Sequence, residues 1–222
     1  MDVEKKYNSK AYRVFEWLFM LLITNICTIL LICPIITSLP AITAMYATIK
    51  DSVSSGPYQP LKAYFKNFLK YSEKSFFVEL VLGGVIVIAV IGVWFYNKRI
   101  GEGEIFSNFG FWVMMFFILI AVILLLHMPQ LIITFTNLKT KELIKTSFYI
   151  SFRYLGVTAV AFALLLVSIF GLAAAPIWFL IGLSGPAFLI IKFSEPLFYR
   201  LNKIDFERIM RQVDEEEEEE NE

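Results

Sequence analysis

Long apolar segments separated by short polar ones run through most of the 222-residue chain. A helix needs about 17–25 apolar residues to cross a bilayer, and several of these segments approach or reach that length. We expect spans at about 17–34, 40–50, 76–96, 109–136, 155–175 and 176–193. The pattern therefore predicts an all-α integral membrane protein, a bundle of five to six transmembrane helices within a single domain over residues 1–200.

The first apolar segment, residues 17–49, is interrupted by Pro34 and Pro40. Proline removes a helical hydrogen bond and clashes with the preceding turn, so it disfavours a straight helix here. Pro40 suits the first turn of a new helix. We expect a helical hairpin with a short returning arm over residues 40–50. Because irregular backbone at membrane depth needs shielding, we also expect the turn from Pro34 to Pro40 to be buried among helices.

The Lys and Arg residues of the short loops set the orientation of a membrane protein. If the first segment enters the bilayer and returns, every Lys and Arg except Lys98 and Arg99 falls on one side. If it crosses once, the basic residues are distributed over both sides. The hairpin arrangement therefore predicts that both termini lie in the cytoplasm.

Two cytoplasmic segments have the pattern of amphipathic helices that lie along the membrane surface. Lysines recur at every fourth position in residues 62–74 with aromatic residues opposite them, and residues 139–153 repeat the pattern more loosely. Contact with anionic lipid headgroups accounts for this pattern, and a docking helix for a partner is the sharper interpretation. The candidate residues for docking or lipid contact are Lys62, Lys66, Lys70, Lys74, Lys139, Lys145 and Arg153.

Polar side chains are rare within the predicted spans, and ionisable residues there are candidates for function. The candidates are Glu79, His127, Asn25 and Gln130. Each also has a structural interpretation. Glu79 would pair with a lysine such as Lys74 or Lys145, because buried charges are normally paired. His127 would hydrogen-bond to a carbonyl group that Pro129 leaves free.

Composition changes at the C-terminus. The net charge of the chain is zero, but an acidic block fills residues 214–220. Like charges in series repel one another and stay solvated. We therefore expect residues 201–222 to form a cytoplasmic helix followed by a disordered acidic tail.

No catalytic motif is found in the sequence. One His and two Cys are too few for the usual metal sites, and the phosphate-binding loop, the nucleophile elbow and the zinc-protease motif are missing. We therefore expect no enzyme activity, no catalytic residue, no metal, no cofactor and no nucleic-acid partner.

Three runs resemble a known family: CPIITSLPAITAMYATIK, LKAYFKNFLKYS and the pattern around LKTKELIKTSFYISFRYL. They resemble the YesL-like bacterial multi-pass membrane proteins, a domain of unknown function, over the chain up to about Tyr199. Members of that family often accompany sugar-uptake ABC transporters. The resemblance implies a bacterial cell membrane location and carries over no catalytic or binding residue.

These observations lead us to expect an accessory membrane protein of a carbohydrate-uptake system. Its partners would be the lipid bilayer and ABC sugar permease subunits or their cytoplasmic partners. The rival interpretation is a small oligomeric carrier or channel for a small solute, which would use Glu79 or His127 with a last helix broken near Gly185 and Pro186. A membrane scaffold whose acidic tail contacts a cytoplasmic partner is the third.

Overall fold

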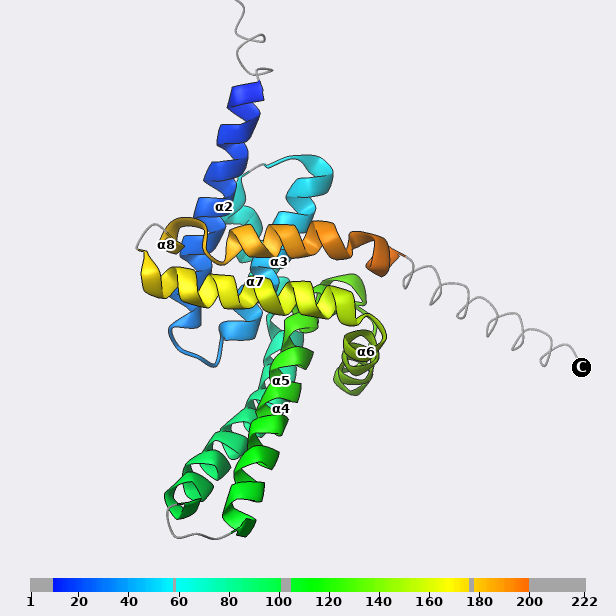
Figure 1. Cartoon of the computed structure of the whole chain (residues 1–222). Helices are drawn as coiled ribbons and strands as arrows, with labels where there is room; N and C mark the ends of the chain where they lie inside the picture. Colours follow the sequence, from blue (N-terminus) through cyan, green and yellow to red (C-terminus); the bar gives the residue numbers. More distant parts are fainter. Residues whose placement is uncertain (1–9, 58, 101–104, 176–177, 200–222) are drawn as a thin grey trace, which may run out of the picture.

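The computed structural model describes residues 10–57, 59–100, 105–175 and 178–199, and these residues are helical apart from short connections (Figure 1). The helices are α2 (Lys10–Ile32), α3 (Ser38–Ser55), α4 (Pro60–Ile100), α5 (Ile105–Thr134), α6 (Thr140–Arg153), α7 (Leu155–Ala174) and α8 (Trp178–Ile181), and residues 184–199 are helical as well. The predicted all-helical class is confirmed for this part of the chain. The predicted cytoplasmic helix and acidic tail over residues 201–222 lie outside the described residues.

Three of the described helices are long and apolar enough to cross a bilayer, namely Tyr12–Ile32, Pro60–Arg99 and Phe106–Thr134. A fourth candidate arises if α6 and α7, which meet at an angle of 99°, are counted as one broken span. The membrane class is therefore confirmed with three to four candidate spans among the described residues, and the finer count of five to six is not.

The proline break in the first apolar segment is confirmed, because α2 ends at Ile32 and α3 begins at Ser38. The returning helix is longer than the predicted residues 40–50. It contains 18 residues, about 27 Å at a rise of 1.5 Å per residue. The helix continues to Ser55, so α3 extends beyond the apolar segment 17–49 by six residues, about one and a half turns.

The predicted burial of the turn is wrong for its tip, since residues 33–36 are exposed and Ile35 is 79% exposed. The reason is local hydrogen bonding. The Ile35 N–H donates to Ile32 O at 2.8 Å, the Ser38 N–H donates to Ile35 O at 3.0 Å, and the Thr37 hydroxyl donates to Leu31 O. With its backbone groups satisfied within the turn, the tip does not depend on surrounding helices for partners.

Residues 60–75 do not form the separate surface helix that their pattern predicts. They are the first part of α4, a continuous helix of 41 residues that includes the predicted span 76–96. Tyr64, Asn67 and Ser75 are buried, so this segment has an inner face that packs on its neighbours. The second predicted amphipathic segment does form its own helix, α6, with Leu143, Ser147, Ile150 and Ser151 buried.

Helix α3 lies at the centre of the described fold, with most of its residues from Leu39 to Ile49 buried. One core cluster joins Met45 and Ile49 of α3 to Met20, Tyr64 and Ile190. Figure 1 shows α7 and the helix at 184–199 running across the direction of α2 and α5. The interior therefore lies where the two sets of helices cross.

Helices α4 and α5 form a hairpin whose far half projects away from the other helices (Figure 1). Its large apolar side chains are mostly exposed there, among them Val87, Ile88, Ile91, Trp94, Phe109, Trp112 and Phe116. Toward the tip, the Lys98 ammonium lies 3.7 Å from the centre of the Trp94 ring and the Arg99 guanidinium lies 4.4 Å from that of Phe95. Aromatic rings and cations of this kind are typical of a membrane–water interface. The exposed apolar side chains between this tip and the other helices are suited to contact with lipid.

The hairpin depends on a close approach at Gly110, where a Cβ atom would lie 2.7 Å from the Tyr96 ring. We expect Gly110→Ala to lower stability by about 1–3 kcal/mol through overpacking, which exceeds the roughly 0.5–1 kcal/mol that the same change gains in helix propensity. Thermal unfolding in detergent measures this. Gly84→Ala is the matched control, because a Cβ atom there meets nothing within 4 Å, and it should leave stability unchanged or raised. Equal melting temperatures for the two variants would contradict the close approach.

Candidate functional site

Glu79 of α4 lies at the N-terminus of α3. Its carboxylate accepts a hydrogen bond from the Ser38 hydroxyl and a second from the Leu39 N–H at 3.2 Å. Thr37, the residue before α3, makes no side-chain cap of its own. A carboxylate at this position satisfies a backbone donor and complements the positive end of the helix dipole. The predicted pairing of Glu79 with Lys74 or Lys145 is not what the structure shows, and the partner is a helix end.

Asn25 of α2 caps the start of the last described helix, which covers residues 184–199. Its side-chain oxygen accepts hydrogen bonds from the Leu183 N–H at 2.9 Å and from the Ser184 N–H at 3.0 Å, and Asn25 is fully buried. These N–H groups are at the start of the helix that covers residues 184–199. Asn25 therefore ties the first described helix to the last one through a cap.

His127 of α5 is 1% exposed, and its Nε2 lies 3.0 Å from the Thr158 hydroxyl. The Thr158 hydroxyl donates to the Ser151 carbonyl at 3.2 Å, so we assign the imidazole as the donor to Thr158. The predicted partner, a carbonyl freed by Pro129, is not the one observed. The contact joins α5 to α7 beside the bend at Tyr154, where α6 ends.

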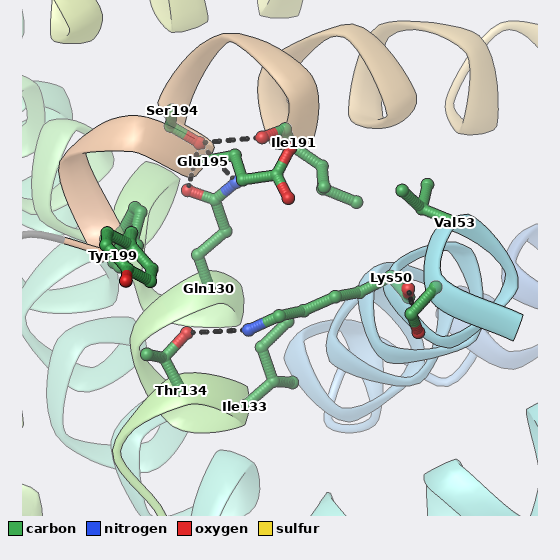
Figure 2. A pocket seen from close by; sticks show the side chains of 11 residues that line it. Lys50, Val53, Gln130, Ile133, Thr134, Ile191, Ser194, Glu195 and Tyr199 are labelled. Carbon is green, nitrogen blue, oxygen red and sulfur yellow. Dashed lines mark hydrogen bonds between the residues drawn. The ribbon is translucent and has the colours of Figure 1, made fainter. Parts of the chain in front are cut away.

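Gln130 of α5 is bonded to Ser194 of the helix at 184–199. The Gln130 side-chain nitrogen and the Ser194 oxygen are 2.7 Å apart, and the Gln130 oxygen is 2.9 Å from the same serine oxygen. Figure 2 shows this pair on one wall of a pocket of about 350 Å³, with Lys50 of α3 on the other side. The Lys50 ammonium donates to the Thr134 hydroxyl at 3.1 Å.

This polar pocket also contains Glu195, the second charged residue of its lining. Although Lys50 is exposed as a residue, its ammonium group is partly shielded by the pocket walls. That shielding lowers the pKa of Lys50, and the carboxylates of Asp51 and Glu195 act in the opposite direction. This pocket could not be predicted from the sequence, because its lining comes from three helices that are far apart in the chain.

The predicted basic residues differ in their environment. Lys74 is half-buried and donates to the Thr136 carbonyl at 2.7 Å, which places a cation at the C-terminal end of α5. The other six are exposed: Lys62, Lys66, Lys70, Lys139, Lys145 and Arg153. Lys74 is thus part of the helix packing, while the other six remain available for a partner or for lipid headgroups.

A second cavity, of about 460 Å³, lies between α3, α4, α5, α7 and the helix at 184–199. Most of its lining is aliphatic, and Glu79 is the charged residue among the described residues that line it. The remaining polar side chains of the lining are those of Ser38, Tyr46 and Ser168, and the Ser168 hydroxyl donates within its own helix to Leu164 O at 2.9 Å. The cavity is therefore an apolar space with a carboxylate in its wall.

The described residues also include side chains of the types that can hold a metal ion. Within the part of the chain that the structure describes, no group of three or more His, Cys, Asp or Glu side chains is arranged to hold a metal ion.

The Tyr64 hydroxyl of α4 donates to Ala41 O at 3.1 Å and accepts from the Thr28 hydroxyl at 3.2 Å. The lysine pattern of residues 62–74 predicted that the aromatic residues opposite the lysines lie on a surface helix, whereas Tyr64 is buried. A polar residue, Asn67, lies one turn after Tyr64 and is buried as well.

Substitution of Glu79 tests whether its carboxylate stabilises the start of α3. We expect Glu79→Ala to lower stability by about 0.5–2 kcal/mol, the usual cost of removing a helix cap, with Glu79→Gln in between because its amide oxygen still accepts a hydrogen bond. Thermal unfolding of the purified proteins in detergent measures this order of stability, from the parent through Glu79→Gln to Glu79→Ala. The neighbouring exposed Leu80→Ala is a control, since Leu80 is 61% exposed. An Ala variant as stable as the parent would contradict the capping role.

Comparison with known proteins gives a family match and nothing closer. Residues 15–98 match the family described as "Protein of unknown function, DUF624", which includes α2 from Phe15, all of α3 and α4 up to Lys98. No curated protein and no solved structure matches the chain. The matched region contains the proline break, Asn25, Glu79 and the lysines of α4. The predicted resemblance is therefore confirmed over residues 15–98, where the chain is similar to this family of unknown function.

Proposed function

We propose that the protein is an accessory integral membrane protein of a bacterial carbohydrate-uptake system that docks on a permease subunit or on the cytoplasmic partners of that permease. The resemblance to the YesL-like family supports the carbohydrate context. The structural support is a basic surface, defined here as the exposed residues Lys62, Lys66 and Lys70 of α4 with Lys139, Lys145 and Arg153 of α6.

The exposure of this basic surface is the observation that carries the proposal. Large apolar side chains accompany the cations, with Leu61, Phe65 and Leu69 on α4 and Phe148, Tyr149 and Phe152 on α6 exposed by 46–76%. Apolar anchors beside cations are the composition of a docking helix. An acidic, partly apolar surface on the cytoplasmic side of a permease has the complementary chemistry.

The polar groups within the candidate spans support docking over transport. Glu79 and Asn25 cap helices, and His127 and Gln130 bond to hydroxyl groups of neighbouring helices. A carrier needs polar groups that face a path for its solute. The cavity beside Glu79 is lined mainly by aliphatic side chains, which suits a polar solute poorly. The small oligomeric carrier or channel is therefore the second candidate.

The proposed orientation places both termini and the N-terminal end of α4 in the cytoplasm of a bacterial cell. We expect a cysteine at position 97 to react with a membrane-impermeant maleimide on intact cells, and a cysteine at position 54 to react only after lysis. Asn97 and Ser54 are both exposed. A Cys33→Ser background removes the exposed native thiol, and Cys27 is buried. Labelling of position 54 from outside would reverse the orientation and remove the basis for cytoplasmic docking.

Docking itself is tested by photocrosslinking in native membranes from position 69, where the side chain is 76% exposed. We expect adducts with a permease or ATPase subunit. Reversing Lys62, Lys66 and Lys70 to Glu should reduce them about tenfold, because three exposed charge contacts are worth about 0.2–1 kcal/mol each.

Lys98→Glu at the far end of α4 is the matched control for this charge reversal, and it should leave the adducts unchanged. Crosslinks to lipid alone, in the parent and in both variants, would contradict docking and would support the simpler role of the lysines as contacts to anionic headgroups.

A further inference from the structure

We infer that the cavity of about 460 Å³ is a binding site for a single-chain amphiphile, a hydrocarbon chain whose hydroxyl or amine head donates a hydrogen bond to Glu79. This inference does not depend on the docking proposal, since the cavity and the basic surface share no residue.

The size and the walls of the cavity fit a hydrocarbon chain. Ligand pockets in proteins commonly have volumes of about 300–1,000 Å³, and the volume here falls in that range. Five helices contribute aliphatic side chains to the walls, among them Ile42, Ile86, Leu125, Leu165 and Ile190. Apolar cavities are poorly filled by water, which needs two to four polar partners. The α4 and α5 walls belong to candidate membrane spans, so hydrocarbon is the medium that surrounds them.

The carboxylate of Glu79 defines the polar end of the ligand. Its described partners are the Ser38 hydroxyl and the Leu39 N–H, and an ionised carboxylate has about four sites that accept hydrogen bonds. Capacity therefore remains for a donor from the ligand. A hydroxyl or an amine donates and suits this site. The carboxylate of a fatty acid would place a like charge beside Glu79 and is disfavoured.

Gly83 keeps the cavity open one turn along α4 from Glu79. It lines the cavity, and a Cβ atom built at this position meets only Glu79 Cγ, at 4.0 Å. A larger side chain at position 83 would therefore enter the open space without striking the backbone of a neighbouring helix. Gly84, the next residue, does not line the cavity and has nothing within 4 Å of such an atom. The two glycines give a matched pair for a test.

The test uses the full chain in lipid nanodiscs with three photoactivatable probes of equal chain length: an alcohol, an amine and a carboxylic acid. Mass spectrometry locates the adducts. We expect the alcohol and the amine to label residues that line the cavity, and the acid to label them several-fold less. Gly83→Leu should reduce labelling by the alcohol at least about tenfold, a change of roughly 1.4 kcal/mol in binding free energy. Gly84→Leu should leave labelling by the alcohol unchanged. Glu79→Gln should reduce the difference in labelling between the alcohol and the acid.

Three results would overturn the inference. The first is labelling confined to the exposed apolar surface of the α4–α5 hairpin. The second is equal labelling of Gly83→Leu and Gly84→Leu, with both variants melting as the parent does. The third is equal labelling by alcohol and acid. If Gly83→Leu fails to fold, Ala187→Leu fills the cavity from the helix at 184–199, where Ala187 lines it and is 2% exposed. Undiminished labelling of that variant would count against the site in the same way.

Discussion

Two helices of this protein begin against a neighbouring helix, and at each start a side chain of that neighbour accepts hydrogen bonds from backbone N–H groups. An unpaired amide in an apolar environment costs several kcal/mol, so the start of a helix inside a membrane protein is a demanding position. Glu79 meets this need for α3 and Asn25 meets it for the helix at 184–199. Because each cap comes from a long helix that is a candidate span, the same contacts that satisfy the backbone also fix where α3 and the helix at 184–199 lie.

The opposite ends of helices are treated in a similar way. The C-terminal end of α5 presents carbonyl groups and a negative dipole end, and two lysines from other helices approach it. Lys74 of α4 donates to the Thr136 carbonyl just beyond the helix, and Lys50 of α3 donates to the hydroxyl of Thr134, the last residue of α5. In both contacts the ammonium group of one helix lies at the C-terminal end of another helix.

Apolar length and proline position were sufficient to predict the helical membrane class and the break between α2 and α3. The same reasoning divided α4 wrongly, because the lysines of residues 62–74 suggested a surface helix, whereas buried Tyr64 and Asn67 show that this segment also has a packed face. The polar candidates were found because polar groups are rare in spans. Their partners were not, since Ser38 is 41 residues from Glu79 and Leu183 is 158 residues from Asn25. Sequence patterns report local periodicity and contain little information on contacts at such separations.

The separation between Asn25 and its partners has a consequence for biogenesis. Ribosomes add about 5–20 residues per second, so Asn25 is synthesised roughly 8–30 seconds before Leu183, given the 158 residues between them. Glu79 follows Ser38 within about 2–8 seconds, with 41 residues between them. The contact of Glu79 with the start of α3 is therefore possible early in synthesis, whereas the contacts of Asn25 with Leu183 and Ser184 form only after the helix at 184–199 has been made.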